Sequence, residues 1–229
     1  MERKLPVITI SRQYAAYGST IARKLSERLG IPFYDKDFQK RAALESGYGE
    51  DEVAREGEEI SRGSMFLNTV LNNSAAYTSS HDEINRAQRK LILELAKEHP
   101  CIIIGRCSDF TLKKAGVDVF RIYLHADLES RKAHAKELGG YTGDVLKYIA
   151  HRDQMRENYC RQYTGHMMGD SRHYEISLDV GAIGVDTSAQ VHQAVEDVVA
   201  GRVTAPEDLI LLDAGACARL TALLRRDVI

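Results

Sequence analysis

The chain has 229 residues, 44% hydrophobic and 28% charged, with 31 basic against 33 acidic side chains. This length suits one α/β domain with a full hydrophobic core. The balanced charge gives no general attraction to nucleic acid or to an anionic membrane surface. No apolar stretch reaches membrane-spanning length, and the four cysteines lack zinc spacing or a disulfide pattern. We therefore expect a cytoplasmic protein with no nucleic-acid or membrane partner.

The first part of the chain alternates short apolar runs with helical patterns. A buried strand is predicted over residues 5–10, and a helix after the turn at 11–19. A second short strand follows at 31–34. The segment 47–82 is polar and weakly periodic, and is interpreted as helices joined by loops.

The rest of the chain repeats this alternation. The predicted helices are 83–98, 128–138, 141–163 and 189–199, and the predicted strands are 101–104, 119–124 and 175–180. Strands that alternate with helices and lack hairpin signals indicate βαβ crossovers and a parallel sheet. Ligands of such sheets bind beyond the carboxyl ends of the strands, so the turns there become candidate sites.

The end of the chain is treated separately. Residues 203–229 contain a capping-box spacing at Thr204 and Glu207 and an apolar face. They are predicted to be a C-terminal helical extension that packs on a domain formed by residues 1–202. A dimer arm is the alternative, which leaves a homodimer open.

The predicted helix 141–163 carries the clearest chemical pattern. Helical spacing places four side chains on one face, which are Arg152, Arg156, Tyr159 and Tyr163. Arg161 lies beside this stripe, and Asp153 is placed to orient Arg156. Arginines on a segment that closes over a bound substrate can neutralise charge during phosphoryl transfer. A solvated charged helix is the alternative interpretation.

Three turns at the expected ligand edge carry candidate anion-binding groups. The turn at 11–20 leads a strand into a helix N-terminus, which attracts phosphate. Arg106 follows a buried strand, and its planar fork suits phosphate oxygens. Asp109 could accept hydrogen bonds from a base or ribose, or pair with Arg106. Asp35 and Lys36 follow the second strand, where Asp35 could be only a helix cap.

Four segments in register resemble the cytidylate kinase-like family. They are ITISRQYAAYGSTIA at 8–22, GIPFYDKDF at 30–38, IIIGRCSDF at 102–110 and RENYCRQYTGHMMGDSRHYEISLD at 156–179. The resemblance implies a P-loop NTPase fold in which helices flank a parallel sheet of about five strands. It also implies a lid at about residues 140–165.

The phosphate loop departs from the P-loop pattern GxxxxGKGT. Arg12 and Tyr17 stand at the two glycine positions, and Gly18 stands at the lysine position. Ala15 also replaces a glycine of the family's own version of this loop. The loop is therefore a degenerate P-loop, and Arg12 or Lys36 is the nearest substitute cation in the sequence.

The resemblance implies a phosphotransferase that uses ATP and Mg²⁺ and acts on a nucleoside monophosphate, cytidylate by analogy, or a similar small phosphorylated acceptor. It assigns the donor phosphates to Ser11, Arg12, Tyr17, Gly18, Ser19 and Thr20, with the Thr20 hydroxyl also near the metal. It assigns the acceptor to Asp35, Lys36, Arg106 and Asp109, and catalytic charge to Arg152, Arg156 and Arg161. The alternative is a non-catalytic nucleotide- or anion-binding regulatory protein on a kinase scaffold.

Overall fold

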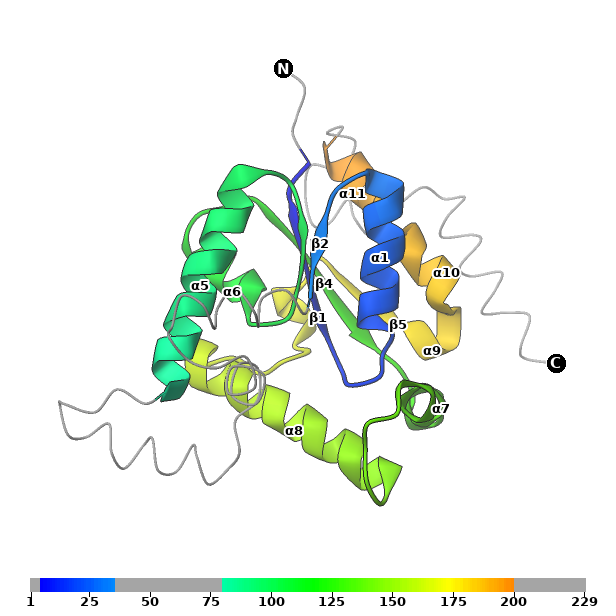
Figure 1. The fold of residues 1–229 in the computed structure, drawn as a ribbon. Helices are drawn as coiled ribbons and strands as arrows, with labels where there is room; N and C mark the ends of the chain where they lie inside the picture. The colour runs from blue at the N-terminus through cyan, green and yellow to red at the C-terminus, as the bar shows by residue number, and fades with distance from the viewer. Residues whose placement is uncertain (1–4, 36–79, 200–229) are drawn as a thin grey trace.

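The fold is that of a computed structural model, which describes residues 5–35 and 80–199. A parallel five-stranded sheet lies at its centre, with strand order β2-β3-β1-β4-β5 (Figure 1). The strands are β1 (Val7–Arg12), β2 (Phe33–Tyr34), β3 (Ile102–Ile104), β4 (Val119–His125) and β5 (Ile176–Asp179). The predicted parallel sheet is confirmed.

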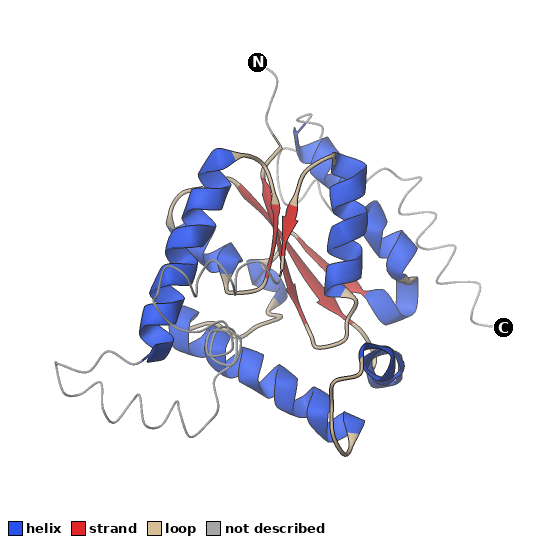
Figure 2. Cartoon of the chain, viewed as in Figure 1, coloured by secondary structure: helices blue, strands red, loops and turns tan. Residues whose placement is uncertain are grey.

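Helices cover both faces of this sheet (Figure 2). The longer ones are α1 (Gly18–Leu29), α5 (Ser80–Glu98), α6 (Ser108–Lys114), α7 (Leu128–Leu138), α8 (Val145–Thr164) and α11 (His192–Val199). Short turns of helix are η1 (Ser171–His173), α9 (Val180–Ile183), α10 (Val185–Ser188) and η2 (Ala189–Val191). Figure 1 shows α5 and α6 on one side of the sheet, α1, α10 and α11 on the other, and α8 running across the end toward which the strands point.

The hydrophobic core divides into two layers because strand side chains alternate between the faces of the sheet. Ile8 and Ile10 of β1 pack with α1 and α11, whereas Val7 packs with α5. In β4 the same alternation turns Ile122 toward α1. Its neighbour Arg121 therefore projects from the opposite face, where it lines a cavity.

The structure refines several predicted boundaries. The helix expected from residue 141 begins at Val145, because the Asp144 side chain accepts hydrogen bonds from the Leu146 and Lys147 amides. The segment 108–114, for which no helix was predicted, forms α6. None of the helices in the described ranges is long and apolar enough to cross a membrane. Lys36, most of the segment 47–82 and the expected extension at 203–229 lie outside the described residues.

Candidate functional site

The loop between β1 and α1 keeps left-handed turns although it lacks the glycines that usually make them. Ala15 has φ 59° and Tyr17 has φ 58°. Such a backbone costs a non-glycine residue roughly 1–2 kcal/mol. Contacts with α7 hold the loop in place: His134 Nδ1 lies 3.0 Å from the Ala15 carbonyl oxygen, and its ring stacks on Tyr17 at 3.8 Å. Ala15 is also buried in a small apolar cluster with residues of α7 and α8.

Arg12 occupies the space beside the residue at which a P-loop lysine would stand. Its side chain is buried and runs over Gly18. A Cβ added at Gly18 would lie 3.1 Å from Arg12 Cγ and 3.6 Å from Arg12 Nε. The glycine at position 18 therefore makes room for the arginine at position 12.

The turn after β3 brings a second buried arginine to the same edge. Gly105, Arg106 and Cys107 have φ 73°, 60° and 49°, so three successive residues are left-handed. The Gly105 amide donates to the Ile10 carbonyl at 3.0 Å, which fixes the turn against the end of β1. Arg106 is only 4% exposed.

Helix α8 brings two further arginines onto the phosphate loop. The Arg156 guanidinium donates to the Arg12 carbonyl at 3.4 Å. Both Arg152 and Arg156 lie over the Tyr14 ring, at 5.5 and 5.6 Å from its centroid. The two arginines of α8 thus contact the phosphate loop through Tyr14, a residue that the sequence analysis did not single out.

Asp153 has a different role from the expected one. Its carboxylate accepts from the Tyr14 amide at 2.7 Å and pairs with Arg131 of α7. The carboxylate that was expected to orient Arg156 thus binds the phosphate loop and α7. Asp153 and Arg156 have the i, i+3 spacing of neighbours on one helix face. The Asp153 carboxylate nevertheless has partners in the loop and in α7.

The other end of the predicted stripe packs on α5. The Tyr159 hydroxyl accepts from Asn85 at 2.6 Å and donates to Gln88 at 3.1 Å, and the Tyr163 hydroxyl donates to Asp82 at 3.2 Å. These contacts fix α8 against α5. Arg161 lies near this end, with its side chain 55% exposed and paired with Glu157 at 3.1 Å.

Five of the predicted site residues meet at one small space of about 20 Å³ near the ends of β1 and β3. They are Ser11, Arg12, Arg106, Asp109 and Arg156. Residues of the wall that the sequence analysis missed are Cys107, Cys160, Met168 and Tyr174. Only their position within the segments that resemble the kinase family could have drawn attention to them. Asp35 is not among the residues that line this space, and its carboxylate accepts from the Ser19 hydroxyl at 2.5 Å.

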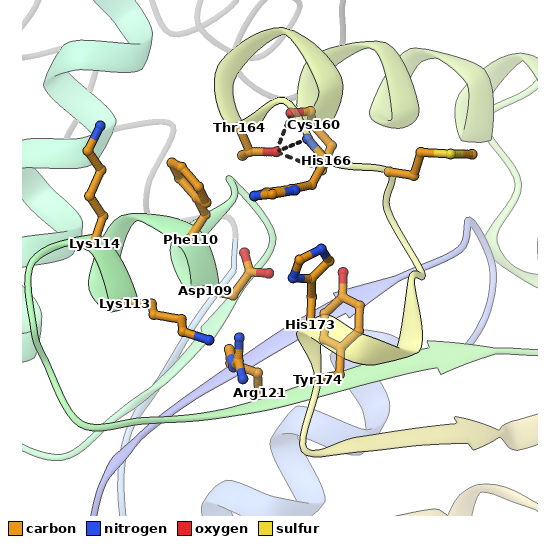
Figure 3. Close-up of a pocket in the computed structure, with 11 residues that line it drawn as sticks. Asp109, Phe110, Lys113, Lys114, Arg121, Cys160, Thr164, His166, His173 and Tyr174 are labelled. Atoms are coloured by element: carbon orange, nitrogen blue, oxygen red, sulfur yellow. Dashed lines mark hydrogen bonds between the residues drawn. The ribbon is translucent and has the colours of Figure 1, made fainter.

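A larger cavity of about 280 Å³ adjoins this space and shares Asp109, Cys160 and Tyr174 with it. Figure 3 shows Asp109 projecting from α6 between the Phe110 and His173 side chains. Burial raises the pKa of the Asp109 carboxyl above its ordinary value, although amides and Arg121 partly oppose this. The cavity therefore combines aromatic walls with an acid whose pKa is raised.

The far wall of the cavity carries an ion pair. Arg121 of β4 donates to Glu175 at 2.5 Å, and this carboxylate raises the pKa of the arginine further. The rings of Phe110 and His166 pack edge to face, with their centroids 5.7 Å apart. The ring centroids of His166 and His173 are 4.3 Å apart. The lining suits a flat polar molecule better than a purely apolar one.

The 2-3-1-4-5 parallel sheet, with a phosphate-loop turn after its central strand, defines a kinase-like P-loop protein. A comparison with protein families matches residues 7–182 to the cytidylate kinase-like family. The chain belongs to that family. A search of curated proteins finds no match.

Solved structures with similar folds were also found. An uncharacterized protein from Eubacterium ventriosum matches with a TM-score of 0.59 and 22% identity, over 83% of this chain and 98% of that chain. A shikimate kinase from Acinetobacter baumannii in complex with shikimate matches with a TM-score of 0.47 and 12% identity, over 87% and 96%. An APS kinase from Mycobacterium tuberculosis gives a TM-score of 0.47 and 14% identity, over 84% and 98%.

Proposed function

We propose that this protein is a phosphotransferase that moves a phosphoryl group from ATP to a nucleoside monophosphate or a similar small phosphorylated acceptor. One observation carries the proposal. Three buried arginines from different elements, Arg12, Arg106 and Arg156, line a single space at the carboxyl edge of the sheet. Buried cations that converge on one point favour a polyanionic ligand, because a ligand phosphate offsets their mutual repulsion.

The donor phosphates are assigned to the turn between β1 and α1. Arg12 supplies the charge that a lysine supplies in other P-loops, since its side chain runs over position 18. The amides at the start of α1, at Gly18, Ser19 and Thr20, add the positive end of the helix dipole. Tyr17 contributes through its backbone, because its ring is stacked on His134.

The acceptor phosphate is assigned to Arg106, and the rest of the acceptor to the adjoining cavity. Asp109 stands at the wall that both spaces share. A protonated carboxyl there can donate to a ring nitrogen and accept from an exocyclic amine, which is the pattern that an aminopyrimidine offers. Lys36 and Asp35 complete the proposed acceptor set.

Phosphoryl transfer at this site needs positioning and charge neutralisation more than covalent chemistry. Arg152 and Arg156 are proposed to stabilise the charge on the transferring group, with Arg161 as a third candidate on the same helix. Helix α8 supplies Arg156 to the wall of the small space and lies between Gly140 and Gly165, which both have positive φ. We therefore propose residues 140–165 as the lid of the site.

Magnesium is proposed to arrive with ATP. Within residues 5–35 and 80–199, no group of three or more His, Cys, Asp or Glu side chains is arranged to hold a metal ion. Such a site suits Mg²⁺ that is held mainly by substrate phosphates and water, with one or two protein ligands. Thr20 is the residue proposed to reach it, and the ion would neutralise charge on the donor phosphates.

The test begins with thermal unfolding in the presence of ATP, GTP and the common nucleoside monophosphates, each with and without Mg²⁺. A ligand that binds only the folded state raises the melting temperature by mass action. Compounds that stabilise the protein then enter an assay of ADP release that depends on the acceptor. We expect stabilisation by one triphosphate and one monophosphate, followed by ADP formation when both are present.

Arginine variants make this test specific to the site. Arg156→Ala should lower turnover by about 100-fold or more, as for the loss of a group that stabilises transition-state charge. Arg23→Ala, on the exposed face of α1, is the matched control and should behave like the wild type. If no nucleotide shifts the melting temperature, the kinase proposal is wrong. Binding without ADP formation would instead favour a non-catalytic nucleotide-binding protein.

A further inference from the structure

Two cysteines from distant parts of the chain meet at the wall of the arginine-lined space. Cys107 precedes α6, and Cys160 lies in α8 one turn after Arg156. Both line the same space, and the Cys107 side chain is hydrogen-bonded to the Cys160 thiol. Neither is fully buried. The phosphotransferase proposal gives these thiols no role.

The surroundings of the pair differ from those of an inert core cysteine. The hydrogen bond from Cys107 is the largest influence on the pKa of Cys160 and lowers it, with help from Thr164. Burial, Asp109 and Glu157 oppose that change. A thiol that ionises more readily is a better nucleophile at neutral pH.

The Cys107 side chain does not cap the helix that it precedes. It occupies the N-cap of α6 in a left-handed conformation, with φ 49°, yet its side chain makes no capping hydrogen bond to the helix. Its sulfur faces α8 instead. The left-handed backbone, which is unfavourable for a non-glycine residue, therefore accompanies a side chain that contacts Cys160.

We propose that Cys107 and Cys160 form an oxidisable thiol pair, which a hydroperoxide such as hydrogen peroxide converts into a disulfide. The Cys160 thiolate attacks one peroxide oxygen, the O–O bond breaks, and the departing hydroxide takes a proton to become water. Cys107 then gives up its proton and attacks the resulting sulfenic sulfur. The S–S bond forms as hydroxide leaves and is protonated, so two thiols and one peroxide yield one disulfide and two water molecules.

The bond would join the turn after β3 to α8 across the space that Arg106 and Arg156 line. Formation of the bond brings the two sulfurs to about 2.05 Å from each other. This inference does not depend on the proposed kinase activity. The experiment that tests it therefore detects the disulfide directly.

The chain supplies an internal control. Cys101 is fully buried at the start of β3, and burial together with Glu98 raises its pKa to about 12. We expect Cys101 to stay a thiol under the same treatment. Cys217 lies outside the described residues, so the experiment uses the full-length Cys217→Ser protein to remove a competing thiol.

The folded Cys217→Ser protein is treated with a small excess of hydrogen peroxide, unfolded, alkylated, digested with trypsin and analysed by mass spectrometry. The expected product joins the peptide 107–113 to the peptide 157–161, two hydrogens lighter than the separate thiols. Dithiothreitol should separate them. Cys101, in the peptide 98–106, should be recovered in its alkylated form.

Two serine variants separate a pair from two independent thiols. In Cys107→Ser the joined peptide is absent, and dimedone should trap Cys160 as its sulfenic acid. In Cys160→Ser we expect Cys107 to be oxidised at least tenfold more slowly. Recovery of both cysteines as free thiols, equal reactivity of Cys101, or separate sulfinic acids in the wild-type pair would each overturn the proposal.

Discussion

Arg12 links the sequence of the phosphate loop to its chemistry. A lysine at position 18 would project into the volume that the Arg12 side chain fills, because an added Cβ already lies 3.1 Å from Arg12 Cγ. The two positions are therefore alternatives for one cation. This relation makes the role of the degenerate loop testable by exchanging the two.

We expect Arg12→Ala to weaken binding of Mg²⁺-ATP by roughly 10- to 100-fold, the effect of losing a charge-assisted hydrogen bond of about 1.5–3 kcal/mol. The double variant Arg12→Ala/Gly18→Lys should recover part of this loss, because the lysine then enters the vacated volume. Isothermal titration calorimetry measures both affinities. Unchanged binding by Arg12→Ala would remove Arg12 from the donor site, and Arg23→Ala serves as the exposed control.

Asp109 shows how burial at the cavity wall becomes a dependence of stability on pH. Its pKa is raised in the folded protein, chiefly by burial. The folded state therefore holds this proton more tightly than the unfolded state, and the associated stability is lost as the pH rises through the raised pKa. An asparagine has the same shape and carries no charge.

We expect Asp109→Asn to have a higher free energy of unfolding than the wild type at pH 8. This difference between variant and wild type should shrink as the pH falls toward the ordinary carboxyl pKa of about 4. Urea unfolding at several pH values measures the difference. Asp118→Asn, at an exposed position before β4, is the matched control for the substitution itself. A difference that stays constant with pH would contradict the role given to Asp109.

At the scale of elements, α8 is fastened at its middle and near its C-terminal end. Tyr159 and Tyr163 attach it to α5, and Asp153 attaches it to α7 and to the phosphate loop. Asp153 accepts from a backbone amide and from an arginine whose side chain is only 10% exposed. Removing the carboxylate would leave Arg131 buried without its counter-ion.

Asp153→Ala should therefore lower the free energy of unfolding by about 2–4 kcal/mol, as for breaking a largely buried pair. The matched control is Glu129→Ala, because the Glu129–Lys132 pair is exposed and worth at most about 1 kcal/mol. Urea unfolding of the two variants gives the comparison. Equal losses would show that Asp153 does not fasten α8 to the loop.

The elements that the sequence could predict are those with a continuous apolar run or with apolar residues at helical spacing. The runs around Ile8 and Ile103 are buried on both faces, so their strand assignment needed no tertiary information. Helix α6 was missed because it begins after left-handed Arg106 and Cys107, a conformation that neither residue favours on its own. Tertiary contacts with β1 determine that turn.

Some features of the candidate site could likewise be predicted from the sequence, and others could not. Ser11, Arg12 and Arg106 follow predicted strands, so their convergence follows from the parallel sheet. The partners of Asp153 could not be predicted, because the choice between Arg156 on its own helix and Arg131 on α7 depends on how the two helices pack. His134 was missed for the same reason, since nothing in its local sequence indicates a contact with Ala15.

At the scale of the whole molecule, the loop after β1 and the turn after β3 present two proposed phosphate sites that face a common space. β1 and β3 are adjacent and parallel, with Ile10 opposite Ile104. Their following turns are therefore held side by side by the sheet rather than by a flexible connection. A transfer enzyme needs this arrangement, because donor and acceptor phosphates must lie in line.

A ligand that spans both sites tests this arrangement directly. Adenosine joined to the acceptor nucleoside through five phosphates should bind at least about 100-fold more tightly than ATP, because the second contact becomes intramolecular. At equal concentrations well above both dissociation constants, this corresponds to about 2.7 kcal/mol of extra stability. Thermal unfolding and calorimetry measure the gain, with ATP and the free monophosphate as references. The Arg106→Ala variant should lose most of the gain while keeping its affinity for ATP. A linked ligand that stabilises the wild type no more than ATP would mean that the two sites are not aligned for transfer.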